Sequence, residues 1–176
     1  MKRMLAMLLA LCLAGCLAGA ACAECVEANM IDQLRNVVRE YLDAQDYKYE
    51  YDESNAAFCM AFGLDCALDA VDVTIYLYDD MVAVFVDCPL PVSEESFEKA
   101  AIFTTLANDQ IHYAQFRINR ESGILTCRSC QIVETVAPDL AEIGTLLNAP
   151  LYYMEAYGDG IAAVCAGGDP YQAFAP

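Results

Sequence analysis

The sequence contains no tryptophan, one histidine and only nine lysine or arginine residues, against 26 aspartate or glutamate residues. The formal net charge of −17 excludes nucleic-acid binding, because contacts to phosphate need clustered positive charge. His112 has no serine or cysteine beside it at a catalytic spacing, and we interpret it as a surface residue. The G-x-S-x-G, H-E-x-x-H, phosphate-loop and EF-hand motifs are all missing. The sequence therefore predicts a non-enzyme with no catalytic, cofactor-binding or metal-binding residues and no cofactor.

The N-terminus has the pattern of an export signal. Two basic residues precede a long apolar stretch, and the segment 21–23 (ACA) supplies the small residues that signal peptidases prefer. This pattern predicts a signal peptide at 1–23 and a released, extracellular or periplasmic chain of 24–176. The removed segment carries two positive charges and no acid, so the mature chain is more negative by two charges.

The segment 13–16 (LAGC) offers a different processing site, because it is similar to the lipobox of bacterial lipoproteins. In that case the signal is 1–15, and a lipid on Cys16 anchors the protein to a membrane. The residues after Cys16 stay small and apolar through Ala23, whereas a polar tether usually follows a lipidated cysteine. Ordinary cleavage is favoured, and the membrane-tethered envelope lipoprotein remains the alternative.

Seven of the ten cysteines remain after cleavage at Ala23. In an oxidising exterior some of them should form disulfides, although the sequence does not encode the connectivity. The odd number leaves at least one cysteine free or intermolecular, and Cys25 beside the new N-terminus is the best candidate. The seven are Cys25, Cys59, Cys66, Cys88, Cys127, Cys130 and Cys165.

The segment 127–130 (CRSC) is the best candidate for thiol chemistry. A redox C-x-x-C motif needs the N-terminus of a helix to lower the pKa of its first cysteine. The flanking residues here alternate as in a strand, so Cys127 and Cys130 should point to opposite faces. We therefore favour structural disulfides, with Cys88 or Cys165 as partners, and keep a thiol-active redox protein as an alternative. A zinc site lacks its remaining ligands.

Periodicity predicts the order of the elements. Helical spacing begins at Met30, alternation predicts three hairpins, and the tail from 169 should be unstructured. A glycine at 123 suits the last tight turn, because glycine adopts positive φ freely. The predicted strands are 47–52, 58–62, 71–77, 82–86, 113–119 and 124–132.

Two further helices are expected. Ser93 should cap the first, which has Phe97, Ala101, Ile102 and Leu106 as its apolar face. Glu94 and Glu95 would lie in its first turn, where the helix dipole favours acids. The second should begin with Pro138 in its first turn and kink or break at Pro150. The order helix, four strands, helix, two strands, helix predicts a single α+β domain: an antiparallel sheet of about six strands with helices packed on one side.

Three stretches carry a resemblance to a known family: YLDAQDYKYEYDE, VTIYLYDDMVAVFVDCPLPVSEESFEKA and FRINRESGILTCRSC. With the order of elements, they resemble the YbjN-like family, whose fold is similar to that of type III secretion chaperones. The resemblance implies an acidic α+β protein that binds another protein or regulates, often as a dimer, and it transfers no catalytic residue. An export signal makes this chain an exported member, for which a secretion-chaperone role does not follow.

Eleven tyrosines are the other notable feature. Most should be core residues, but any that remain exposed would be good interface anchors. We therefore predict an exported, non-enzymatic protein-binding or regulatory module that contacts a protein partner, or a second copy as a homodimer, through a sheet face or a helix groove. The tyrosines that share a face are Tyr47, Tyr49 and Tyr51, then Tyr76 and Tyr78, and finally Tyr152, Tyr153 and Tyr157.

Overall fold

The computed structural model describes residues 30–174. The predicted signal peptide, Cys16 and Cys25 therefore lie outside the described residues. An N-terminal helix occupies residues 30–44, and six strands and four labelled helices follow. Their bounds are β1 Glu50–Asp52, β2 Ala57–Gly63, β3 Ala70–Leu77, β4 Met81–Asp87, α2 Phe97–Gln110, β5 Gln115–Ile118, β6 Leu125–Ile132, α3 Leu140–Ala156, α4 Gly158–Cys165 and α5 Pro170–Phe174.

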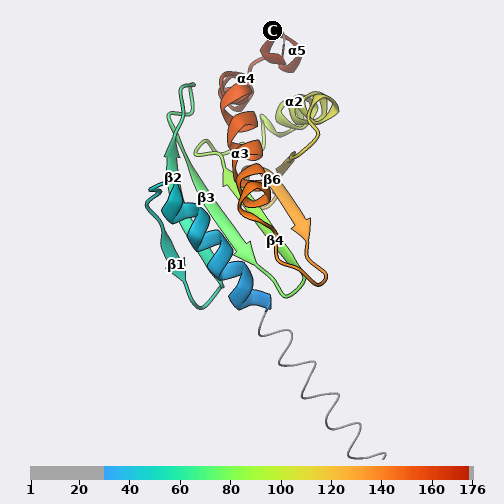
Figure 1. Cartoon of the computed structure of the whole chain (residues 1–176). Helices are drawn as coiled ribbons and strands as arrows, with labels where there is room; N and C mark the ends of the chain where they lie inside the picture. Colours follow the sequence, from blue (N-terminus) through green and yellow to red (C-terminus); the bar gives the residue numbers. More distant parts are fainter. Residues whose placement is uncertain (1–29, 175–176) are drawn as a thin grey trace, which may run out of the picture.

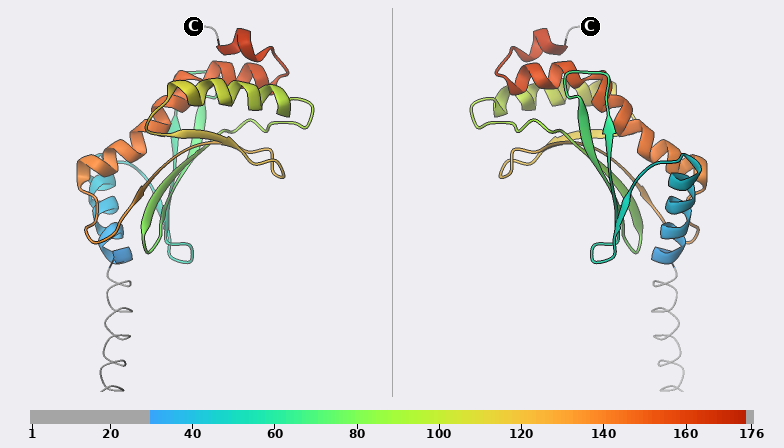
Figure 2. Two further views of the ribbon diagram at one scale, coloured as in Figure 1. Left: turned by 90° about the vertical axis from the view of Figure 1, so that its right-hand side faces the viewer. Right: turned by 90° about the vertical axis from the view of Figure 1, so that its left-hand side faces the viewer.

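All six strands form one antiparallel sheet in the order β1-β2-β3-β4-β6-β5. In the last hairpin, β5–β6, it is β6 that pairs with β4, so β5 is an edge strand of the sheet. Figures 1 and 2 show the helices gathered on one side of a strongly curved sheet, with the other side uncovered. The predicted α+β fold, with an antiparallel sheet and helices on it, is confirmed.

Alternation along the strands separates the two faces of the sheet. Val73 and Ile75 of β3 are buried beneath the helices, while the alternate residues Thr74 and Tyr76 point to the uncovered side and are half-buried. From the opposite layer, Leu34 of the N-terminal helix is fully buried. This period of two is why the hairpins could be predicted from the sequence.

The start and the buried face of α2 differ from the prediction. Ser96, rather than Ser93, is the residue before its first turn. The Ser93 hydroxyl accepts a hydrogen bond from the Ser96 amide at 3.2 Å. This bond closes a separate turn, which also contains Glu94 and Glu95. The predicted face is only half-buried. The residues of α2 that are buried are Ala100, Phe103, Thr104 and Ala107.

The start of α3 is set by Asp139 and not by Pro138, which precedes the helix. Asp139 and Glu142 form a reciprocal cap: the Glu142 amide donates to Asp139 Oδ1 at 2.9 Å, and the Asp139 amide donates to Glu142 Oε2 at 2.8 Å. Pro150 lies inside the helix without ending it, and the chain leaves α3 at Tyr157 instead.

Pro150 leaves one helix carbonyl without its usual partner. Proline has no amide hydrogen, so it cannot donate to the carbonyl oxygen of Leu146, four residues earlier. The hydroxyl of Ser129 on β6 donates to that oxygen at 2.6 Å, in a buried contact. The substitute donor satisfies the carbonyl and fixes the position of α3 on the sheet.

The tail prediction was wrong, because residues 170–174 form α5. Phe174 stacks on Tyr157, with ring centroids 5.9 Å apart, and packs edge-to-face on Phe103 at 6.0 Å. Two aromatic contacts to α2 and to the α3–α4 junction hold this short helix in place.

Candidate functional site

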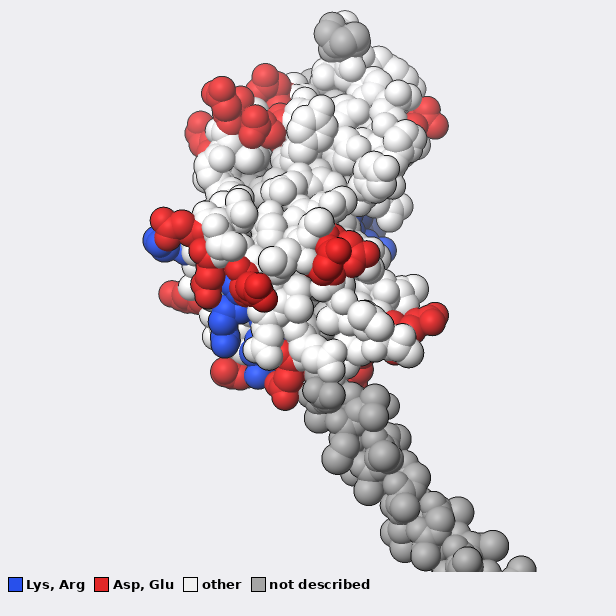
Figure 3. Space-filling model, in the orientation of Figure 1, with Lys and Arg blue, Asp and Glu red and all other residues white. Residues whose placement is uncertain are grey.

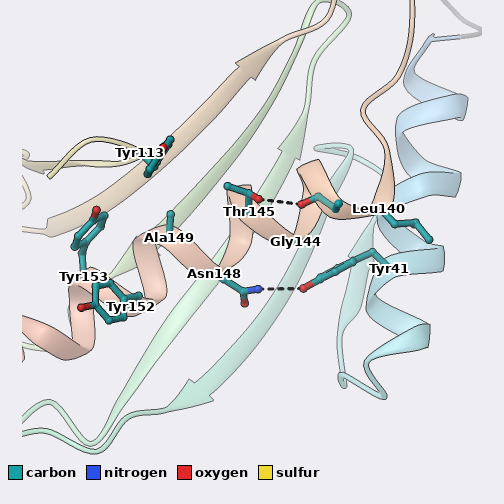
Figure 4. A pocket seen from close by; sticks show the side chains of 10 residues that line it. Tyr41, Tyr113, Leu140, Gly144, Thr145, Asn148, Ala149, Tyr152 and Tyr153 are labelled. Atoms are coloured by element: carbon teal, nitrogen blue, oxygen red, sulfur yellow. Dashed lines mark hydrogen bonds between the residues drawn. The ribbon is translucent and has the colours of Figure 1, made fainter.

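A shallow, largely apolar hollow lies along the outer side of α3 and has a volume of about 460 Å³. Figure 4 shows the side chains that line it. Small residues form its floor, among them Gly144 and Ala149 of α3, and aromatic rings stand around them. We call this hollow the α3 groove. Its other lining residues are Tyr41, Tyr113, Leu140, Ala141, Thr145, Asn148, Tyr152 and Tyr153.

Tyr41 of the N-terminal helix builds one wall of the α3 groove. Its hydroxyl accepts a hydrogen bond from Asn148 Nδ2 at 3.3 Å, which joins two helices 107 residues apart in sequence (Figure 4). Its ring packs directly on Gly144: a β-carbon there would lie 3.0 Å from Tyr41 Cε2. A side chain at 144 would require the Tyr41 ring to shift by a few tenths of an ångström, so glycine favours this close approach.

Two tyrosines on the groove are exposed to solvent. Tyr113, from the loop between α2 and β5, is 71% exposed, and Tyr152 of α3 is 67% exposed. Leu140 at the start of α3 is 38% exposed. Large aromatic side chains that remain this accessible are typical anchors of protein interfaces, because their burial removes much apolar surface from water.

Charge is arranged around the groove and not within it. The space-filling view shows a broad surface with few charged side chains, with one acidic group within it and others at its margins (Figure 3). The acids of α3 itself, Glu142 and Glu155, are exposed, and neither α3 nor α4 contains lysine or arginine. An uncharged centre with a polar rim is the usual composition of a protein-binding surface.

The uncovered side of the sheet carries a smaller hollow of about 210 Å³. Half-buried Tyr76 and Phe85 pack edge-to-face there, with centroids 5.5 Å apart. Charged side chains interrupt it: Arg117 lines the hollow, and Asp87 accepts from the Thr126 hydroxyl at 2.6 Å. This mixed-charge surface is a weaker candidate for an apolar partner than the α3 groove.

The predicted tyrosine groups have different fates in the structure. Tyr47, Tyr49 and Tyr51 pack against the hydrophobic core, and the Tyr51 hydroxyl accepts from Arg35 Nε at 2.8 Å. Tyr76 and Tyr78 lie on the uncovered side of the sheet, where Tyr78 is 41% exposed. In the third group Tyr157 is turned toward the core, so Tyr152 is its most accessible member.

Sequence reasoning missed three residues of the α3 groove. Tyr113 was predicted as the first residue of the strand 113–119, whereas β5 begins at Gln115 and Tyr113 lies in the loop before it. Tyr41 lies in the helix predicted to begin at Met30, but the position of Asn148 beside it depends on how two distant helices pack. No local pattern in the sequence could have brought these residues together.

The two cysteines of the CRSC segment point to opposite faces, as predicted. Cys127 is fully buried beneath the helices, whereas Cys130 is exposed on the uncovered side. Burial raises the pKa of the Cys127 thiol to about 12. A thiol that is buried, protonated and turned away from its neighbour in the motif is poorly suited to exchange with an external disulfide.

The remaining candidates lie in ordinary surroundings. His112 is exposed in the loop before β5, and Asp79 and Asp80 form the turn between β3 and β4. Within residues 30–174 no cluster of histidine, cysteine or acidic side chains has the geometry to hold a metal ion. No helix in this part of the chain combines the length and apolarity needed to cross a membrane. The six cysteines of the same part are free thiols, so the disulfides stay a prediction.

Comparisons with known proteins place the fold. No protein family model matches the sequence, and no curated protein matches it either. Among solved structures it is similar to YbjN from E. coli, described as a candidate transcription regulator, with a TM-score of 0.53 and 13% sequence identity. The match covers 78% of this chain and 92% of that chain. The chain therefore has an α+β fold that is distantly YbjN-like.

Proposed function

We propose that this protein is an exported, non-enzymatic binding module whose α3 groove receives an apolar segment of a protein partner. The observation that carries the proposal is the pair of exposed tyrosines, Tyr113 and Tyr152, beside a floor of small residues. The YbjN-like fold is compatible with a protein-binding or regulatory role.

The groups in the groove favour binding over chemistry. Its polar side chains are hydroxyls and one amide, which hold hydrogen bonds but do not exchange protons readily near neutral pH. Two of them, Tyr41 and Asn148, are already hydrogen-bonded to each other. The Thr145 hydroxyl donates back to the Ala141 carbonyl at 3.0 Å.

Charge indicates which partner fits. The helix that forms the floor of the groove has two exposed acids and no basic residue, on a chain of net charge −17, so a second copy would bring like charges together. A partner with an apolar centre and a basic rim gains attraction at the same margin. We therefore assign the groove to a basic protein partner rather than to a homodimer.

The expected strength follows from the two tyrosines. A buried interface tyrosine typically contributes about 2 kcal/mol, which corresponds to a roughly 30-fold change in affinity. Substituting both Tyr113 and Tyr152 by alanine removes both contributions. If the effects add, binding should weaken by about two to three orders of magnitude.

The test compares matched variants in capture from the exported fraction of the source cells. Wild type and Tyr171→Ala should retain the same partner, because Tyr171 is 64% exposed but lies outside the groove. The Tyr113→Ala/Tyr152→Ala variant should lose it, and added salt should weaken the wild-type complex. Equal capture by both variants would refute the assignment of the groove. Sedimentation that shows a dimer dissociated by the groove substitutions would assign it to a second copy instead.

Export itself is part of the proposal. The intact mass of the protein recovered from outside the cytoplasm distinguishes cleavage after Ala23 from lipid attachment at Cys16. A mature chain that begins at Glu24 supports the soluble form. A lipid-bearing mass would support the tethered form, and an unprocessed Met1 in the cytoplasm would contradict both.

A further inference from the structure

The fold gathers three cysteines at one end of the sheet. Cys66 lies in the connection between β2 and β3, Cys88 directly follows β4, and Cys165 is the last residue of α4. They are distant in sequence, yet Cys66 and Cys165 both pack against the hydrophobic core to which Cys88 belongs.

Cys66 is held against the first turn of α4. A β-carbon at residue 158 would collide with the Cys66 sulfur, so the glycine there permits the contact. The amide of the next residue, Ala67, donates to Asp159 Oδ1 at 2.8 Å. These contacts dock α4 on the β2–β3 connection.

Cys88 lies on the helix-covered side of the sheet. Its amide donates to the Leu125 carbonyl at 2.8 Å, which prolongs the ladder beyond β4. The alternation that buries Val84 and Val86 continues to Cys88, which is only 7% exposed. Its sulfur therefore faces the helix layer.

Cys165 lies on the face of α4 that packs inward. It follows Gly158 by two helical turns, so both occupy one side of the helix with the buried Ile161 between them. The Lys99 ammonium donates to the Gly167 carbonyl, which joins the first turn of α2 to the residues just after Cys165. The loop after Cys88 leads into α2, and the first turn of α2 is thus tied to the end of α4.

The electrostatics of Cys88 agree with this placement. Burial raises the pKa of its thiol to about 11, and negative charge on Cys165 and then on Cys66 would raise it further. Burial also raises the pKa of Cys165. The Cys88 thiol is therefore buried, and the thiols of Cys165 and Cys66 are near enough to act on it electrostatically.

We propose that Cys88 and Cys165 are a redox pair that closes to a disulfide when the protein meets a disulfide oxidant, and that Cys66 stays a free thiol. The bond would tie the end of β4 to the end of α4. The proposal draws on the predicted export only for the oxidising surroundings, and it is independent of the α3 groove.

The chemistry is ordinary thiol–disulfide exchange. The Cys165 thiolate, the less buried of the two, attacks one sulfur of the oxidant and releases one thiolate as the leaving group. The Cys88 thiolate then attacks the Cys165 sulfur of the mixed disulfide and releases the second. Two protein thiols lose two protons and two electrons, and the oxidant is reduced to two thiols.

The test oxidises the purified, reduced protein with oxidised glutathione and maps its linkages by mass spectrometry without reduction. Wild type should lose the mass of two hydrogens and yield a peptide pair that joins Cys88 to Cys165. The Cys66→Ser and exposed Cys59→Ser variants should keep that linkage, whereas Cys165→Ser should lose it. Circular dichroism confirms that each variant is folded.

The oxidised wild type should also unfold at a higher urea concentration than the reduced protein, because a disulfide restricts the unfolded chain. A linkage of Cys88 to Cys66, a bond between two chains, or thiols that all remain free under this oxidant would overturn the proposal. The linkage map uses the wild-type chain, so the result does not depend on a variant's ability to fold.

Discussion

The contact between Ser129 and the Leu146 carbonyl should be worth more than an ordinary helix-to-sheet hydrogen bond. Its acceptor has no alternative donor, because residue 150 is a proline. Substituting Ser129 by alanine leaves a buried carbonyl unsatisfied and removes only one oxygen atom. Such an orphaned group costs about 1–3 kcal/mol, so we expect the free energy of unfolding to fall by that amount.

A double-mutant cycle isolates the reason. In a Pro150→Ala background, the amide of residue 150 can donate to Leu146, and the Ser129→Ala cost should shrink to below about 1 kcal/mol. Urea unfolding followed by circular dichroism measures all four proteins. Thr105→Ala is the control, since its exposed hydroxyl donates at 2.8 Å to the Ala101 carbonyl, in a helix that has no proline. An equal Ser129→Ala cost in both backgrounds would refute this account.

Three further predictions concern caps, turns and thiols. Asp139→Ala should lower the free energy of unfolding by about 1 kcal/mol in urea titrations, because the N-cap of α3 loses its acceptor. Asp52→Ala should destabilise the protein at neutral pH but not near pH 2. Hydrogen bonds from the side chains of Ser54 and Asn55 and from the Ser54 amide lower the Asp52 pKa from 3.8 to about 2. The stabilisation is therefore full above pH 4 and is lost as the pH falls through the folded-state pKa. Urea unfolding of both proteins at pH 7, 4 and 2 checks the sign, and an unchanged difference at pH 2 would contradict it. Iodoacetamide should label Cys130 in the native protein at pH 8 while Cys127 reacts only after unfolding, and rapid native labelling of Cys127 would restore the thiol-active alternative.

Local patterns in the sequence were sufficient for the sheet. Val73 and Ile75 alternate with polar or aromatic neighbours, and strand periodicity needs no knowledge of the rest of the chain. The same reasoning failed for α2, which has apolar residues around most of its circumference. When Ile102 and Phe103 are adjacent, only the tertiary packing decides which one is buried.

The α3 groove and the docked tail depend on distant pairs. Asn148 meets Tyr41 across 107 residues, and Phe174 is ordered by the ring of Tyr157. Neither contact leaves a periodic trace, because each is made by single side chains on different elements. Composition indicated that some tyrosines would serve as anchors, but the packing of helices determined which of them remain accessible.

The two outermost strands have a consequence for self-association. β1 has three residues and β5 has four, and Arg117 places a charge on the latter. Short, charged margins give another chain few amide and carbonyl groups with which to extend the ladder. Fibre growth by pairing of edge strands from different chains is therefore disfavoured. Stable association of this protein should instead use side chains on its faces.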